Sequence, residues 1–223
     1  MGEEFFWDGR AATLEQQVLQ PILNPLELAT TPAAVVALAR SDRYRRPFAE
    51  AFGTEPTIDD VTRALASYVR TIVTGDSRYD RYTAGDRAAL GASALRGLGT
   101  FRGKAGCTGC HVGPTFTDEQ FHNTGVAWRT GALTDEGRAR VTRAEKDRGA
   151  FKTPTLREVA RTAPYMHDGS FATLEEVIDY YDRGGQKNPG LDPDLRPLHL
   201  SAADKRDLLA FLTSLTGDIR DGH

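Results

Sequence analysis

The stretch "KAGCTGCHVGP", residues 104 to 114, holds both cysteines of the 223-residue chain, with a histidine directly after the second. Redox dithiols, structural zinc sites and covalently attached haem all use two cysteines separated by two residues. A redox dithiol of the thioredoxin type requires a βαβ setting, and structural zinc requires a second ligand pair, toward which His122 supplies one residue. The pattern Cys107-x-x-Cys110-His111 is typical of haem c, whose vinyl groups take up the two thiols while the histidine becomes the proximal iron ligand.

A long loop is expected after this motif. Between Gly103 and Pro154 no apolar period persists, while glycine, threonine and polar residues accumulate. A loop of this length in a compact protein needs an internal scaffold, and a large cofactor would supply one. A C-x-x-C pair that stands before a histidine by chance would leave the loop unexplained.

Helical periodicity dominates the remainder of the chain. Residues 57–73 open with a capping-box pattern, which predicts an amphipathic helix with one apolar stripe formed by Ile58, Val61, Leu65, Tyr68, Val69 and Ile72. Five further segments have helical patterns with start signals: 13–24, 31–41, 86–101, 173–185 and 201–215. Because alternating β patterns are nearly absent, the sequence predicts an all-α fold, with residues 74–86 as the boundary between two halves.

The composition indicates a globular protein without polyanionic partners. Its 28 basic and 31 acidic residues are spread along the chain, so there is no basic stripe for nucleic acid. The longest apolar run, residues 33–39, is too short to span a membrane. Since haem attachment of this kind takes place outside the cytoplasm, we expect a periplasmic protein, and the absence of a leader after Met1 then indicates a mature or trimmed chain.

A second side chain must close the other face of the iron. The residues able to do so are Met166, His167, His122, His199, Tyr180 and Tyr181. Methionine raises a haem potential, whereas tyrosinate favours ferric iron and lowers it. On the helix predicted from Thr173, Tyr181 shares a face with Leu174, Val177 and Ile178, so it is the tyrosine expected to point inward. Spacing alone is also consistent with Tyr181 and Met166 as core residues, and with His199 and His223 as solvated ones.

Several segments together resemble the bacterial di-haem cytochrome c peroxidases and their MauG-like relatives. The matching stretches follow the order of the family over nearly the whole chain: 6–17 (FWDGRAATLEQQ), 80–90, 106–118 (GCTGCHVGPTFTD), 151–178 and 208–218 (LLAFLTSLTGD). The resemblance implies two c-type haems in two domains, one transferring electrons and one reacting with hydrogen peroxide. By this resemblance residues 1–80 are the helical remainder of the N-terminal, peroxidatic domain. Residues 81–223 are then the C-terminal c-type cytochrome domain, whose electron-transfer haem is bound by His111.

The resemblance also implies roles for individual positions. In the family the sixth ligand lies fourteen residues after the histidine of an HDG motif, as methionine in peroxidases and tyrosine in MauG-like proteins, and this count from His167 ends on Tyr181. Trp7 matches the tryptophan between the two haems, and Gln17 and Glu27 match the pair over the peroxide site. A carboxylate there moves the peroxide proton, and an amide orients the substrate.

Further expectations concern ions and partners. Thr162 and Pro164 match positions whose backbone carbonyls help to bind calcium between the domains, with a partner asparagine upstream of residue 1. The resemblance also implies hydrogen peroxide as substrate, a small electron-donor protein of the cytochrome or cupredoxin type, and a homodimer.

The chain departs from the family pattern in two places. A second C-x-x-C-H motif is expected upstream of Trp7, so the chain is interpreted either as part of a longer peroxidase, which we favour, or as a single-haem descendant. Ala105 replaces a tryptophan that relays electrons in MauG, which argues against maturation of a methylamine dehydrogenase precursor. The functions considered are therefore a di-haem peroxidase, a mono-haem electron-transfer cytochrome without catalysis, and a MauG-like oxidase of a protein side chain.

Overall fold

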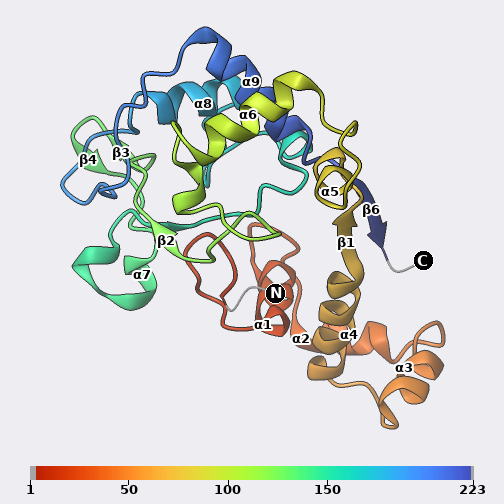
Figure 1. Ribbon diagram of the computed structural model, residues 1–223. Helices are drawn as coiled ribbons and strands as arrows, with labels where there is room; N and C mark the ends of the chain where they lie inside the picture. Colours follow the sequence, from red (N-terminus) through yellow and green to blue (C-terminus); the bar gives the residue numbers. More distant parts are fainter. Residues whose placement is uncertain (1–3, 222–223) are drawn as a thin grey trace. The chain divides into compact units, whose positions relative to one another are not determined.

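The computed structural model describes residues 4–221, which divide into two compact units. The first unit comprises the chain up to Phe6, Ala11–Val73 and the chain from Arg220; the second comprises Trp7–Arg10 and Thr74–Ile219. The helices of the first unit are α1 (Leu14–Leu23), α2 (Pro32–Ala39), α3 (Arg45–Phe52) and α4 (Ile58–Thr71) (Figure 1). The predictions of α1, α2 and α4 are thus confirmed, whereas α3 was not predicted.

Side-chain caps start most of these helices. The Thr13 and Thr31 hydroxyls each accept a hydrogen bond from the backbone amide three residues on, and Thr57 and Asp60 form the predicted capping box of α4. Both α1 and α2 pack on α4, and Arg70 of α4 forms an ion pair with Glu15 of α1 at 2.7 Å. Helix α3 has no side-chain cap at its start, so no capping residue marks its beginning in the sequence.

The apolar stripe of α4 is not buried as its pattern suggests. Leu65, Tyr68 and Val69 are 37%, 48% and 39% exposed, and Ile72, the stripe residue directly after the end of the helix, is 45% exposed. The buried residues of α4 are instead Asp60, Thr62 and Ala66. The helix is therefore confirmed, but within residues 4–221 its apolar stripe remains accessible to solvent.

The second unit combines helices with very short strands. Its α-helices are α5 (Arg78–Thr83), α6 (Ala92–Arg102), α7 (Ala139–Thr142), α8 (Leu174–Asp182) and α9 (Ala202–Thr213). Its 3-10 turns are η1 (Cys107–Gly109), η2 (Glu145–Asp147) and η3 (Val159–Arg161). The predicted α8 and α9 are confirmed, while α6 begins later than predicted, at Ala92, because residues 87–90 form a turn and a bend.

The described residues include three two-stranded β-ladders, which the all-α prediction did not contain. Strand β2 (Phe121–His122) pairs antiparallel with β5 (Phe151–Lys152), and β3 (Trp128–Arg129) pairs antiparallel with β4 (Ala132–Leu133). Strand β1 (Ile72–Gly75) pairs with β6 (Asp218–Asp221). Strands of two to four residues are too short to show a clear alternating pattern, so the all-α prediction is not confirmed in detail.

Close packing of α6 on α9 organises the core of the second unit, and α8 joins them (Figure 1). A Cβ on Gly97 of α6 would lie 1.9 Å from the carbonyl oxygen of Asp207 in α9, so this approach requires glycine. Arg96, the preceding residue, forms an ion pair with Asp207 at 2.6 Å. Beside this contact, an aromatic cluster has ring centroids separated by 5.0 to 6.2 Å and consists of Tyr79, Phe101, Phe116 and Phe211.

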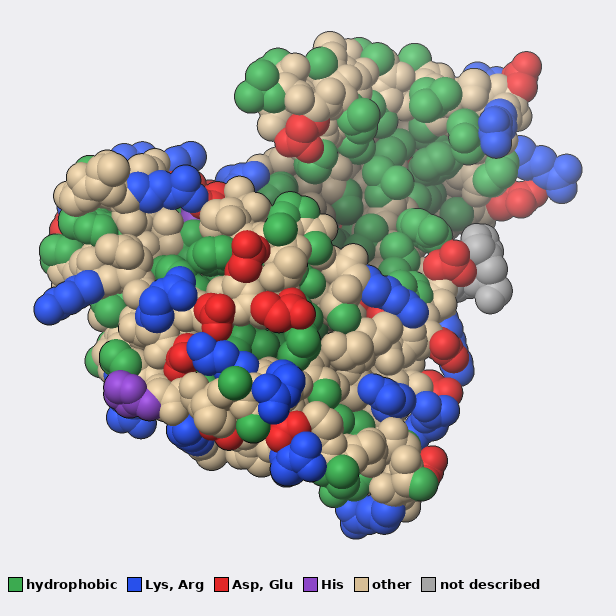
Figure 2. Space-filling model, turned by 90° about the horizontal axis from the view of Figure 1, so that it is seen from above, with side chains coloured by type: hydrophobic (Ala, Val, Ile, Leu, Met, Phe, Trp, Pro, Cys, Tyr) green, Lys and Arg blue, Asp and Glu red, His purple; other side chains and the backbone are tan. Residues whose placement is uncertain are grey.

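The expected loop region from Gly103 to Pro154 contains only short elements, in agreement with the sequence. Among residues 4–221, no helix has both the length and the apolar character needed to cross a membrane. On the face that Figure 2 shows, basic and acidic side chains are intermingled, and hydrophobic side chains gather over part of it.

Candidate functional site

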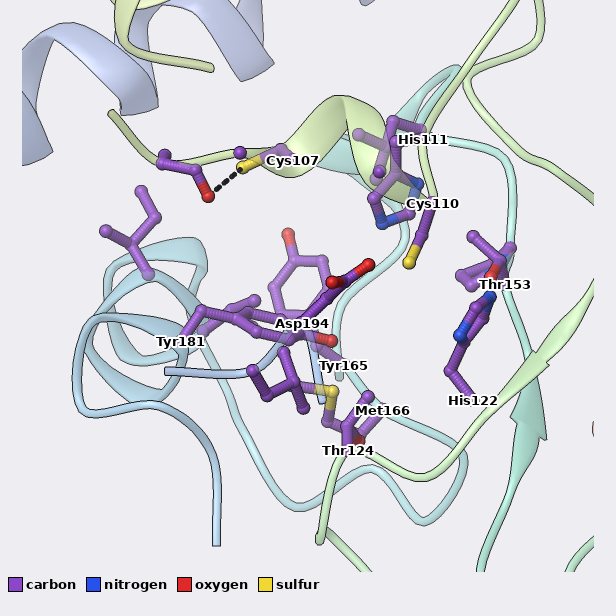
Figure 3. A pocket seen from close by; sticks show the side chains of 18 of the residues that line it. Cys107, Cys110, His111, His122, Thr124, Thr153, Tyr165, Met166, Tyr181 and Asp194 are labelled. Atoms are coloured by element: carbon purple, nitrogen blue, oxygen red, sulfur yellow. Dashed lines mark hydrogen bonds between the residues drawn. The ribbon is translucent and has the colours of Figure 1, made fainter. Parts of the chain in front are cut away.

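The C-x-x-C-H motif forms a tight turn a few residues after the end of α6. Gly106 adopts a left-handed conformation (φ 61°) that leads the chain into η1, and the His111 amide donates a hydrogen bond to the Cys107 carbonyl at 2.9 Å. This turn places Cys107, Cys110 and His111 together on one wall of a pocket (Figure 3). Both thiols are free, and burial raises the pKa of Cys107 to about 12.

His111 is held in one tautomer. Its Nδ1 lies 2.8 Å from the carbonyl oxygen of Phe116, which accepts but never donates a hydrogen bond. Nδ1 therefore carries the proton, and Nε2 carries the lone pair. Burial lowers the pKa of His111, so the ring is neutral at physiological pH. A neutral imidazole with its second nitrogen anchored to a carbonyl is the usual form of a metal ligand.

The pocket behind this wall is mainly apolar and has a volume of about 240 Å³. Its aliphatic and aromatic lining comes from the core helices and from the loops between them: Phe101, Val126, Leu156, Val159, Leu174, Val177, Ile178, Leu195, Leu198, Leu200, Leu208 and Leu212. Apolar walls with a few convergent polar groups are typical of a cofactor site.

The wall opposite the cysteines contains Tyr165, Met166, Tyr181 and Asp194 (Figure 3). Tyr181 lines the pocket from α8, which confirms that it is the inward-facing tyrosine, and burial raises the pKa of its phenol. Tyr180 points elsewhere: its hydroxyl donates to the Thr124 carbonyl at 2.8 Å, and its ring packs edge-on against Tyr181 at 5.7 Å. Of the six candidate sixth ligands, Tyr181, Met166, His122 and His167 line the pocket, whereas Tyr180 and His199 do not.

A charged cluster lies beside Cys110. His122 lies between the carboxylates of Asp192 and Asp118, with Nδ1 2.6 Å from the first and Nε2 2.9 Å from the second. A hydrogen bond to Cys110, assisted by those to Asp192 and Asp118, raises the pKa of His122 to about 10. The two aspartates were not singled out from the sequence, because Asp192 lies 70 residues from the histidine that it contacts.

These features fit covalent haem better than structural zinc. The Cys110 sulfur, an Asp118 oxygen and a His122 nitrogen lie within 4.8 Å of one another, and among the described residues no second cysteine joins this group. A structural zinc site of the usual kind has four protein ligands, commonly with more than one cysteine. A large apolar pocket faced by two thiols and a neutral histidine instead matches what haem c requires.

Of the other residues predicted to have a role, some line the pocket and some do not. Trp7, a residue that is 40% exposed, lines the same pocket. His167 also lines it, and its ring stacks on that of Phe151 with the centroids 3.6 Å apart. Gln17 and Glu27 belong to the first unit and do not line the pocket; the Glu27 carboxylate accepts a hydrogen bond from Asn24 at 2.7 Å.

The remaining predicted positions lie near the end of η3 or at the surface. The Thr162 hydroxyl donates to the Val159 carbonyl at 3.2 Å, and a cis peptide bond precedes Pro164. His199 is exposed, as expected, whereas His223 lies outside the described residues.

Comparison with known proteins agrees with this geometry. The family model "Di-haem cytochrome c peroxidase" matches residues 1–88. The chain is 41% identical to the methylamine utilization protein MauG of Methylorubrum extorquens and 39% identical to the cytochrome c551 peroxidase of Nitrosomonas europaea. In both cases the match covers 97% of this chain and 62% of the relative, so the chain spans less than two thirds of either protein.

A solved structure shows the same fold. The crystal structure of a MauG-like protein associated with microbial copper homeostasis superimposes with a TM-score of 0.89 at 33% identity. The match covers 97% of this chain and 73% of that one. The overall fold of this chain is therefore that of an experimentally solved MauG-like protein.

Proposed function

Because the chain belongs to the family of di-haem cytochrome c peroxidases and MauG-like proteins, we propose that it carries the electron-transfer haem of a peroxidase that reduces hydrogen peroxide. The observation that carries the proposal is the turn of Cys107, Cys110 and His111 facing one apolar pocket. Residues 81–223 are proposed as the electron-transfer domain, and residues 1–80 as part of the peroxidatic domain.

The residues of the pocket have distinct roles in this proposal. The Cys107 and Cys110 thiols would hold haem c through thioether bonds, and the haem supplies reversible one-electron transfer when bound. The Phe116 carbonyl fixes the proton of His111 on Nδ1, so that Nε2 is the nitrogen offered to iron. Binding of the Tyr181 oxygen requires loss of its proton, which burial opposes and a nearby metal cation favours.

The peroxide chemistry is assigned from the family match. We assign Gln17 to orienting peroxide and Glu27 to moving its proton, at a second haem site. Trp7 is assigned to electron transfer between the two sites, supported by its place in the lining of the pocket. Thr162 and Pro164 are assigned to a calcium site through their carbonyl oxygens. A small cytochrome or cupredoxin in the periplasm would supply the electrons.

One measurement separates this function from its main rival. The protein purified from its own host is analysed for intact mass, for covalent haem and for turnover of hydrogen peroxide with a reduced small cytochrome. We expect a mass above 24.4 kDa, two haems and measurable turnover. A single haem without turnover would instead establish a mono-haem electron-transfer cytochrome.

Similarity to MauG supports a second candidate, the oxidation of a protein side chain. The inward position of Tyr181 favours this candidate, since it places a tyrosine where MauG-like proteins have their ligand. Ala105 disfavours a methylamine dehydrogenase precursor as the target. A peroxide-dependent mass change in a co-purified protein would support this activity, and unchanged masses of all co-purified proteins would exclude it.

A further inference from the structure

The charged cluster of His122, Asp118 and Asp192 has no part in the function proposed above. His122 ends β2 and has a carboxylate oxygen within hydrogen-bond distance of each ring nitrogen. An ionised carboxylate accepts hydrogen bonds and donates none, so both ring nitrogens must carry a proton. The histidine is therefore an imidazolium held between two negative charges.

Backbone contacts hold the cluster in place. The Asp118 carboxylate also accepts a hydrogen bond from the Gln120 amide at 2.9 Å, and the Asp192 carboxylate accepts one from the Asp194 amide at 2.9 Å. Pairing of β2 with β5 fixes His122 opposite Phe151. The three side chains are only 17% to 23% exposed, so their charges are screened less than those of surface groups.

The cluster lies at the place where haem would be attached. The Cys110 sulfur lies within 4.8 Å of a His122 nitrogen and an Asp118 oxygen, and in a c-type haem this sulfur is bonded to a substituent of the porphyrin. Figure 3 shows His122 beside Cys110 on the pocket wall. A thioether sulfur carries neither proton nor charge, so in the haem-bound protein the two carboxylates are the groups that keep His122 protonated.

We propose that His122 is a positioning residue for the haem, a fixed positive charge at the Cys110 edge that raises the reduction potential of the electron-transfer site. Reduction adds one electron, so a nearby positive charge favours the reduced form and a negative charge disfavours it. Asp118 and Asp192 hold the imidazolium in place, and their two negative charges leave the cluster with a net charge of −1, so the effect of His122 is the difference from the same cluster without its imidazolium. Other charged groups of the pocket lining, Lys152, Asp194 and Arg196, carry both signs and set the background potential.

Optical redox titration of the intact haem-bound protein tests the proposal. His122→Asn removes the positive charge, and the midpoint potential is expected to fall. Asp192→Asn keeps its side-chain oxygen on the Asp194 amide but turns an NH2 group toward Nδ1 of His122, so the second ring proton is no longer held. The potential of this variant is expected to rise as the pH falls from about 8 to 5 and the imidazolium forms, whereas His122 of the unmodified protein keeps its charge over this range. His199→Asn, at an exposed histidine outside the pocket lining, is expected to leave the potential unchanged.

The dependence on pH distinguishes an electrostatic role from a structural one. A potential of His122→Asn equal to or above that of the unmodified protein would overturn the proposal, as would a potential of Asp192→Asn that does not rise in acid. If His122→Asn loses its haem, the decision rests on the pH dependence of Asp192→Asn.

The inference rests on the proposed function, since it requires haem on Cys110. Covalent haem is therefore measured in every sample by haem staining of denaturing gels and by the pyridine haemochrome spectrum. Absence of covalent haem from the unmodified protein would refute the proposed function and this inference together. Haem present with unmoved potentials would refute the inference alone.

Discussion

At the scale of single residues, the sixth iron ligand gives the sharpest prediction. Tyr181 and Met166 both line the pocket opposite His111, so the geometry admits either side chain. We expect Tyr181→Phe to change the ferric haem spectrum, because it removes the only oxygen of that side chain. Met166→Leu, which keeps the side chain apolar and similar in volume, is expected to leave the spectrum as it was. The reverse result would assign the ligand to methionine.

An ion pair of the second unit predicts a dependence of stability on pH. Asp80 caps α5 together with Ser77 and lies 2.7 Å from Arg157. Burial alone would raise the pKa of Asp80, but hydrogen bonds from Arg157 and Ser77 outweigh it and lower the pKa. A carboxyl with a lowered folded-state pKa stabilises the fold above its unfolded value of about 3.9, and this contribution is lost as the pH falls through the folded value.

Urea unfolding at several pH values between about 7 and 2 measures this contribution. Asp80→Asn is expected to lower the free energy of unfolding at neutral pH and to flatten its decline in acid. Asp42→Asn, at an exposed position, is the control. Identical pH profiles for Asp80→Asn and the unmodified protein would contradict the role of this pair.

At the scale of elements, the contact between α6 and α9 depends on one glycine. Gly97→Ala would place a Cβ against the backbone of Asp207, so we expect a loss of about 1 to 3 kcal/mol in the free energy of unfolding. Gly99→Ala lies on the same helix with no neighbouring atom within 4 Å of its Cβ. This control is expected to gain about 0.5 to 1 kcal/mol through helix propensity. Equal effects of the two substitutions, measured by thermal unfolding, would refute the close packing.

The elements also show how far the sequence alone reaches. Helices with a Ser or Thr cap and an apolar period, such as α4, α8 and α9, were predicted, since both signals are local. Helix α3, without a side-chain cap, and the short ladder of β2 and β5 were not, because tertiary contacts decide them. The site divides in the same way: the C-x-x-C-H turn is local, whereas the contact of His122 with Asp192 joins distant segments.

At the scale of the whole molecule, the exposed apolar stripe on α4 predicts a surface that promotes association. Monomeric soluble proteins rarely expose contiguous apolar patches, and large ones mark sites of association. We expect the 223-residue chain to bind a hydrophobic dye and to self-associate as its concentration rises. Tyr68→Gln combined with Ile72→Gln should weaken both effects while changing the free energy of unfolding by about 0.5 kcal/mol or less.

A single exposed leucine provides the control for this surface. Leu26, 92% exposed, stands outside the stripe, so Leu26→Gln should alter neither dye binding nor association. Dye fluorescence and sedimentation velocity measure the two effects. Dye binding that persists in the Tyr68 and Ile72 double variant would show that the dye binds a surface other than the stripe.

Phe116 links the aromatic core to the expected haem ligand, because its backbone and its side chain make different contacts. Its carbonyl oxygen orients His111, while its ring packs edge-on against Phe211 and Phe101 in the core. Because one residue makes both contacts, a change in that aromatic packing is expected to shift the Phe116 carbonyl and, with it, the His111 ring. The visible absorption spectrum of the haem-bound protein would then report on the packing of the aromatic core, several residues away from the iron.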